Sequence, residues 1–496
     1  MTLEGAIAHF ATLTPDKAAV ITATERLTYA SLHHRICERA KQLQSDGLCA
    51  GQPYAFTTTQ DADFIVTYCA VHLCGAVSVP LESSTTKECQ QQILDGLNGQ
   101  DTLTSFNRNE MVNGPSATTI APWRKSVQER SMVNISDVLF TTGTTGNAKG
   151  VMISEEAWTA NAENLTDRLG FTAELLFIVC GPLNHLGSLS KIYPTLTNGA
   201  TLYIMSNLKD LGAFFSVFDL PFARFATFLV PSSIRMLLQF ARSELSAVAR
   251  KIDFVETGAA PISQSDMEQL CQTLPHSRLF NTYASTETGI VCSYEFSRYG
   301  CVPGLVGPPM KHSTVRIAED GRVVCSGSTI MSGYVGSPQA SAQVLREGEV
   351  YTSDFGIISP DGMLHLQGRG DDIINVGGYK VNPIEVENAA SACPLIQDCI
   401  CVPAPHPVLG TAPKLFYVPR QDQTVKPRLI ADFLKGRLES YKIPLFYEAT
   451  EAIKRTYNGK LDRKAYNDEK LFIAVRGKAP NQRSTKSRRD RPQTGV

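Results

Sequence analysis

The chain has 496 residues, 43% of them hydrophobic, and 47 basic against 48 acidic residues give a formal net charge of −1. Bulk charge therefore does not favour a protein that binds nucleic acid or a membrane surface. The 13 cysteines contain no Cys-x-x-Cys pair and the N-terminus lacks a secretion signal, so we expect reduced thiols without a disulfide framework or zinc site, and a cytoplasmic location.

The N-terminal third contains one apolar stretch, Phe64 to Leu81, that approaches the length of a membrane span. A span needs about 20 mainly apolar residues, but this stretch contains His72, Gly75 and Pro80. The pattern instead predicts a helix that ends at Leu73, a break at Gly75 and a buried strand. We therefore expect no membrane span.

Strand-like apolar runs alternate with helical patterns along the first 370 residues. The predicted helices include 30–43 and 232–240, and the predicted strands include 139–140, 175–180, 202–205 and 252–256. This alternation favours an α/β fold in which helices cover largely parallel sheets.

A strand that begins at Val138 runs into a loop of threonines and glycines that ends in Lys149 and Gly150. Glycines let successive amides face one anion and hydroxyl groups add donors, so the loop is typical of phosphate binding. It is not the loop of a P-loop NTPase, because Ala148 precedes Lys149 and no Ser or Thr follows it. Taken alone, the loop leaves a Gly/Thr-rich surface turn open.

The composition changes near Arg369, where Gly-Arg-Gly-Asp-Asp predicts a joint between domains. Beyond the joint, predicted helices at 383–390 and 428–438 and a strand at 399–402 suffice for a small α+β unit of about 100 residues. We expect a large domain over residues 1–370, a small domain over 371–470 and a basic, disordered tail over 471–496.

Further segments suit ATP chemistry, and their order resembles the adenylate-forming superfamily of acyl- and aryl-CoA synthetases, adenylation domains of nonribosomal peptide synthetases and firefly luciferase. Together with the loop at 141–150, the matching segments are 181–187, 256–261, 281–289, 351–356, 368–372 and 454–463. The resemblance runs from about Thr14 to about Tyr466. It implies ATP-dependent activation of a carboxylic acid to an acyl-adenylate, followed by transfer to a thiol.

The resemblance also implies a nucleotide site built from several segments. Lys149 would stabilise the departing pyrophosphate, Thr286 would meet the α-phosphate, and Glu287 would hold Mg²⁺, a cation that prefers oxygen ligands. The other residues expected to bind ATP are Thr141, Thr142, Gly143, Thr144, Thr145, Gly258, Ala259, Ala260, Asn281, Thr282, Tyr283, Ala284, Ser285, Asp354 and Arg369.

By the same resemblance, His185 lines the acceptor end of an acyl pocket and Lys460 is the first-choice catalytic residue. A compact cation can bridge the attacking carboxylate and the phosphate, where negative charge crowds. Asp371 falls at the family's hinge, about which the small, mobile domain rotates after adenylation. That rotation would bring Gly378 and Lys380 to the pantetheine of coenzyme A.

The resemblance implies a small-molecule carboxylic acid as the substrate, and an α-amino acid is disfavoured. No acidic residue lies between Glu174 and Asp210, near the expected acyl pocket, and a buried ammonium without a counter-ion is costly. The leading hypothesis is an aryl or short-to-medium acyl–CoA ligase that uses ATP, Mg²⁺ and coenzyme A. The alternatives are transfer to the phosphopantetheine of a separate acyl carrier protein, and a non-catalytic nucleotide-binding homologue.

Overall fold

A computed structural model describes residues 1–82, 97, 117–119, 134–141, 149–420, 425–455 and 461–466, with the backbone alone for 117–119, Asp371 and Lys464. The predicted site residues Thr142, Gly143, Thr144, Thr145 and Lys460, and the predicted basic tail, lie outside the described residues. The chain divides into two compact units, Met1–Asp372 with Arg455–Leu461, and Ile373–Lys454 with Asp462–Val496. Each unit is described by itself.

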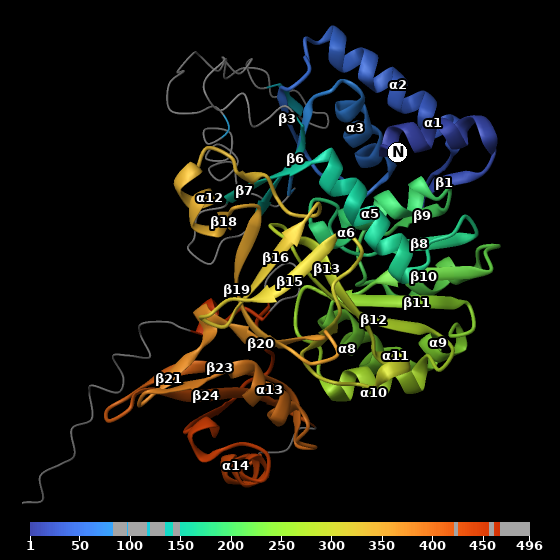
Figure 1. The fold of residues 1–496 in the computed structure, drawn as a ribbon. Coiled ribbons are helices and arrows are strands. Elements are labelled where there is room, and N and C mark those ends of the chain that lie inside the picture. The colour runs from blue at the N-terminus through green and yellow to red at the C-terminus, as the bar shows by residue number, and fades with distance from the viewer. Residues whose placement is uncertain are drawn as a thin grey trace, which may run out of the picture. The chain divides into compact units, whose positions relative to one another are not determined.

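Within the described residues, the large unit contains an eight-stranded, mainly parallel sheet (Figure 1). Its order is β13 (Gly289–Glu295), β12 (Arg278–Ser285), β11 (Ile252–Gly258), β10 (Arg224–Phe228), β8 (Leu175–Val179), β9 (Thr201–Ile204), β1 (Ala18–Ile21) and β2 (Arg26–Thr28). The residues of β8 are all buried, as expected for a parallel strand covered on both faces.

Helices cover both faces of this sheet (Figure 1). They are α5 (Glu155–Leu169) and α6 (Leu186–Thr197) on one face, and α8 (Pro231–Phe240) and α10 (Gln264–Thr273) on the other. Separate hydrophobic clusters lie under the two layers. The predicted α/β architecture is confirmed.

A second sheet carries the strands that flank the predicted phosphate loop. Its order in the described part is β17 (Gly333–Tyr334), β7 (Lys149–Ser154), β6 (Ile135–Thr141), β4 (Val77–Leu81), β3 (Pro53–Thr57) and β5 (Ala117–Thr119). The preceding helix α3 (Ala62–Leu73) ends where the sequence predicted, and β4 follows it. None of the described helices is long and apolar enough to cross a bilayer.

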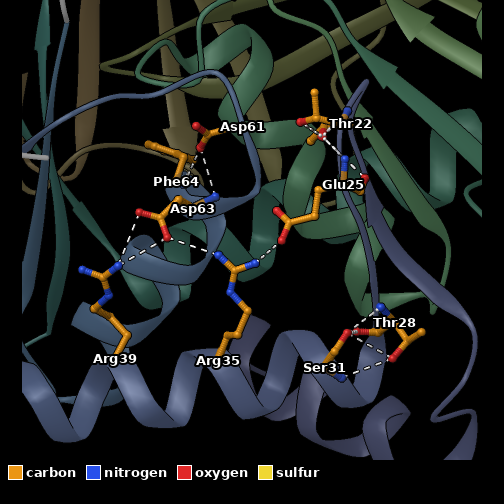
Figure 2. A network of polar contacts seen from close by, with 10 residues as sticks. Thr22, Glu25, Thr28, Ser31, Arg35, Arg39, Asp61, Asp63 and Phe64 are labelled. Carbon is orange, nitrogen blue, oxygen red and sulfur yellow. Dashed lines mark hydrogen bonds and ion pairs between the residues drawn. The ribbon is translucent and has the colours of Figure 1, made fainter. Parts of the chain in front are cut away.

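Polar contacts join α3 to the neighbouring helix α2 (Tyr29–Ser45), as Figure 2 shows. The amide of Ser31 donates to Thr28 Oγ1 at 3.2 Å and Ser31 Oγ accepts from the Thr28 amide at 2.7 Å, which caps the start of α2. Farther along α2, Arg35 and Arg39 reach the Asp63 carboxylate at 3.4 and 3.3 Å. Half-exposed ion pairs of this kind contribute little to the free energy of folding, so their main effect is to fix the orientation of α2 relative to α3.

A buried polar network lies between α3 and β6. His72 Nδ1 lies 3.0 Å from Glu4 Oε1, its Nε2 lies 3.4 Å from Asp137 Oδ2, and Trp158 Nε1 donates to the same Asp137 oxygen at 2.6 Å. Burial lowers the pKa of His72, but Asp137 and Glu4 outweigh burial and raise that pKa to about 10. The imidazole is therefore cationic at neutral pH.

This network predicts a pH dependence of stability. A group whose pKa rises on folding stabilises fully below its unfolded pKa, about 6.5 for His, and loses that contribution as the pH rises through the folded value. We expect the stability advantage of the native protein over His72→Asn to be largest below pH 6.5 and to shrink up to about pH 10. Thermal unfolding of both proteins, followed by circular dichroism at pH 6, 8 and 10, measures this stability difference. A stability difference that does not change with pH would contradict the ion pairing of His72.

A third sheet of the large unit contributes two of the predicted site residues. Its main path in the described part is β14 (Leu305–Gly307), β20 (Leu364–Arg369), β19 (Glu349–Ile358), β16 (Arg322–Gly327) and β15 (Ser313–Ile317). Asp354 on β19 and Arg369 on β20 are paired residues of antiparallel strands. The fold thus places two motifs that are separate in sequence side by side.

The small unit is α+β, as predicted. Its described strands are β22 (Tyr379–Val381), β21 (Ile374–Val376), β24 (Gly410–Pro419), β23 (Ile396–His406) and β25 (Phe446–Ala449), and its helices include α13 (Pro383–Ser391) and α14 (Pro427–Lys435). The prediction that the last helix reaches Leu438 is wrong. The helix ends at Lys435 because Gly436, a poor helix former, takes the capping position.

Candidate active site

The carboxyl ends of β11 and β12 bring the predicted adenine-site segments together. The two strands are parallel, with Gly258 opposite Thr282 and Thr257 opposite Asn281. Ligands of α/β proteins bind at such strand ends. The residues placed there are Gly258, Ala259, Ala260, Asn281, Thr282, Tyr283, Ala284 and Ser285.

Two of these side chains hold neighbouring strands. Asn281 Nδ2 donates to the carbonyl oxygen of Leu305 at 3.0 Å, and Thr282 Oγ1 donates to Ser293 Oγ at 3.2 Å. Both residues are buried. These two side-chain hydrogen bonds therefore fix β13 and β14 around the site.

Tyr283 connects this strand end to the predicted ribose-binding carboxylate. Its hydroxyl donates to Asp354 Oδ2 at 2.7 Å. Burial, and secondarily the Asp354 carboxylate, raise the pKa of Tyr283 well above its ordinary value, so the hydroxyl keeps its proton. An aromatic ring and a carboxylate are thus held in fixed geometry, and Arg369 is the residue paired with Asp354 on β20.

Thr286 and Glu287 lie in the turn between β12 and β13. The turn is fixed by two bonds of 3.1 Å, from the Ser285 amide to Thr288 Oγ1 and from the Thr288 amide to Ser285 Oγ. Glu287 Oε1 accepts a hydrogen bond from the Tyr334 hydroxyl at 3.0 Å. Among the described residues no hydrogen bond reaches Oε2 of Glu287, so this oxygen can face a cation.

These residues fit Mg²⁺ bound together with ATP. The described part of the chain contains no group of three or more His, Cys, Asp or Glu side chains that could hold a metal. Mg²⁺ commonly uses one or two carboxylates and takes its remaining ligands from phosphates and water. A single carboxylate with an available oxygen suits that mode.

The base of the predicted phosphate loop lies on paired strands. Thr141 at the end of β6 is opposite Lys149 at the start of β7. The Lys149 Nζ atom lies 5.0 Å from the centroid of the Tyr334 ring. Tyr334 therefore contacts both Lys149 and Glu287, a role the sequence analysis missed because no motif spacing marks this residue.

The segment expected beside the acyl group forms the start of α6. His185 is the N-cap residue of α6 and is half-buried. A β-carbon at Gly187 would lie 2.9 Å from the Phe228 ring, and one at Gly258 would lie 3.6 Å from it. The two glycines thus pack against an aromatic side chain at the end of β10.

A buried ion pair adjoins Phe228. Lys191 Nζ lies 2.9 and 2.8 Å from the two carboxylate oxygens of Glu256, and both side chains are 1% exposed. Burial lowers the pKa of Lys191 below its ordinary value, while the Glu256 carboxylate opposes that shift. The sequence analysis did not detect this pair, because Lys191 belongs to no motif.

The remaining predicted residues of the small unit lie on one hairpin. Gly377 and Gly378 form the two-residue turn between β21 and β22, with positive φ at both positions, as a type I′ turn requires. The Gly378 amide donates to Asn375 Oδ1 at 3.1 Å, and Lys380 lies on β22. In the large unit, the predicted hinge residue Asp371 lies in the short helix η3 (Gly370–Asp372).

The sequence profile described as AMP-binding enzyme matches residues 7–335, and that described as AMP-binding enzyme C-terminal domain matches residues 385–460. The chain belongs to the AMP-binding enzyme family. This membership confirms the predicted relationship to the adenylate-forming superfamily. It also confirms the prediction of an enzyme, an AMP-forming acid–thiol ligase.

Relatives cover nearly the whole chain. The chain is 26% identical to a feruloyl-CoA synthase from Amycolatopsis sp and 24% identical to a 2-succinylbenzoate–CoA ligase from Bacillus cereus, over 91% of this chain and 95% of each relative. Its fold is similar to that of ATP-bound MatB from Rhodopseudomonas palustris, with a TM-score of 0.80, 21% identity and coverage of 94% of this chain and 99% of that one.

Proposed function

We propose that this chain uses ATP and Mg²⁺ to activate a small aryl or short-to-medium acyl carboxylic acid and transfers the acyl group to coenzyme A. The observation that carries this proposal is the convergence of Tyr283, Asp354, Glu287 and Lys149 in the large unit. The Tyr283–Asp354 bond and the contacts of Tyr334 with Glu287 and Lys149 support the proposal, because they hold side chains whose chemistry suits a purine, a ribose, Mg²⁺ and phosphate.

In the first half-reaction, a carboxylate oxygen attacks the α-phosphorus of ATP and pyrophosphate leaves. The Tyr283 ring stacks near the purine, Asp354 accepts from the ribose hydroxyls, and Thr286 contacts the α-phosphate. Lys149 and the threonines of the loop stabilise the β- and γ-phosphates, while Lys460 bridges the two anions as they meet. When bound through Glu287, Mg²⁺ neutralises phosphate charge.

In the second half-reaction, the thiol of coenzyme A attacks the acyl carbon and AMP leaves. Asp371 is the proposed hinge for the small domain, and Gly378 and Lys380 are the proposed contacts for the pantetheine arm. A rotation that withdraws Lys460 would admit the thiol to the adenylate. The phosphopantetheine thiol of a separate carrier protein is the alternative acceptor.

An aryl acid is the favoured substrate class. The relatives named above include a feruloyl-CoA synthase and a 2-succinylbenzoate–CoA ligase, and Phe228 offers an aromatic contact beside Gly187 and Gly258. An α-amino acid stays disfavoured, because the Glu256 carboxylate that could meet its ammonium is already paired with Lys191.

The experiment is pyrophosphate release from ATP and Mg²⁺ against a panel of aryl, fatty, dicarboxylic and amino acids, with and without coenzyme A. We expect release that depends on an aryl or short acyl acid, and AMP turnover that rises with coenzyme A. If a phosphopantetheinylated carrier protein raised AMP turnover and coenzyme A did not, the carrier protein would take the place of coenzyme A as the proposed acceptor. Tight ATP binding without release for any acid would contradict the proposal.

A further inference from the structure

The segment Met331–Val335, called here the bridging segment, contacts both halves of the proposed phosphate site. At one end, the Met331 amide donates to the backbone oxygen of Glu287 at 2.9 Å. At the other end, the Val335 amide donates to the Gly150 oxygen at 2.8 Å, directly after Lys149. Between these bonds, β17 pairs antiparallel with β7. One short segment therefore links the Glu287 turn to the base of the phosphate loop.

Tyr334 extends this link through its side chain. The hydroxyl donates to Glu287 Oε1 at 3.0 Å, and the ring centroid lies 5.0 Å from Lys149 Nζ. The side chain is itself buried, at 5% exposure, and the Tyr334 amide donates to Ser341 Oγ at 2.8 Å. A rigid aromatic side chain held in this way fixes the carboxylate and the ammonium relative to each other.

The bridging segment packs closely against β7. A β-carbon at Gly150 would lie 2.5 Å from a methyl group of Val335 and 2.9 Å from the side chains of Phe140 and Val138. Real β-carbons do not approach other atoms this closely, so only glycine permits the contact. The position of Tyr334 is thus determined by backbone pairing and by packing.

We propose that Tyr334 is a positioning residue that orients Glu287 toward Mg²⁺ and holds Lys149 in place for the phosphates of ATP. The proposal rests on the proposed nucleotide site. A hydrogen bond to one carboxylate oxygen leaves the other directed at the cation, as partners outside the ligand shell of a metal commonly do. The ring face attracts the Lys149 ammonium and limits where it can go before ATP binds.

Two substitutions separate the two contacts. Tyr334→Phe removes the bond to Glu287 but keeps the ring, whereas Tyr334→Leu removes both. Calorimetric titration with ATP, with and without Mg²⁺, measures the gain in affinity that Mg²⁺ provides. We expect Tyr334→Phe to reduce that gain by about 10-fold or more while ATP alone binds as to the native protein. Tyr334→Leu should also weaken the binding of ATP alone by a few-fold.

The matched control is Tyr294→Phe. Tyr294 is a buried tyrosine on β13 whose hydroxyl donates to the Gly300 oxygen at 3.0 Å. It lies outside the predicted site segment 281–289. This control should leave the Mg²⁺ effect unchanged, and circular dichroism should show that all variants are folded. An unchanged Mg²⁺ effect in Tyr334→Phe, or an equal loss with and without Mg²⁺, would overturn the positioning role. Absence of ATP binding by the native protein would instead overturn the nucleotide site itself.

Discussion

Lys191→Met is expected to lower the free energy of unfolding of the large unit by about 3–5 kcal/mol. The substitution leaves the Glu256 carboxylate, which is 1% exposed, without its counter-ion. Removing one partner of a buried pair is strongly destabilising because the remaining charge stays desolvated. Glu256→Leu should have a similar effect, because it leaves the buried Lys191 ammonium without its counter-ion. The ammonium would then lie beside the Phe228 ring, whose centroid is 5.1 Å away.

The double variant Lys191→Met/Glu256→Leu is the decisive comparison. It removes both charges, so most of the stability lost in either single variant should return. Both tryptophans of the chain, Trp123 and Trp158, lie within residues 1–372, so their fluorescence during urea unfolding reports on the large unit. As a control in the same unit, Lys41→Met breaks an exposed pair with Glu38 and should change stability by less than about 1 kcal/mol.

A Lys191→Met variant within about 1 kcal/mol of the native protein would contradict this account of the pair. Additive losses in the double variant would contradict it too, because they would mean that each side chain stabilises through packing and not through the other's charge. Either result would also remove the second reason given for disfavouring α-amino acid substrates, which is that the charge of Lys191 occupies the Glu256 carboxylate.

The sequence predicted the architecture well because local patterns decide it. Apolar runs that alternate with helical patterns marked the strands β8, β9 and β11, and the predicted helix end at Leu73 was confirmed. The family resemblance grouped the motif residues at the ends of β11 and β12 in advance, and the fold places them together because the carboxyl ends of parallel strands meet at one edge of a sheet.

The contacts that organise the candidate site could not be predicted in the same way. Tyr283 and Asp354 are 71 residues apart, Glu287 and Tyr334 are 47 apart, and Lys191 and Glu256 are 65 apart. Each pair depends on the order of strands in a sheet or on the face from which a helix side chain projects. Neither quantity can be read from residue spacing within a single segment.

Lys460→Ala is expected to slow adenylation by about 10²–10³-fold, the loss typical when one preorganised electrostatic contact to the transition state is removed. Lys460 itself lies outside the described residues, but the segment that follows it is anchored in the small unit. Arg463 donates to Glu387 Oε2 at 2.9 Å and to the Cys401 oxygen at 2.7 Å. The Lys454 amide donates to the Tyr466 hydroxyl at 2.8 Å. The substitution should therefore remove an ammonium without unfolding the segment.

The two half-reactions distinguish this role from a general defect. Acid-dependent exchange of pyrophosphate into ATP should fall in Lys460→Ala, whereas transfer from the synthetic acyl-adenylate to coenzyme A should stay near the native rate. The second expectation follows from the proposed rotation, which withdraws Lys460 before the thiol attacks. Lys435→Ala, which removes an exposed ammonium from α14, should leave both rates unchanged. Equal losses in both half-reactions would contradict the assignment, because they would show that the small domain needs Lys460 after adenylation as well as during it.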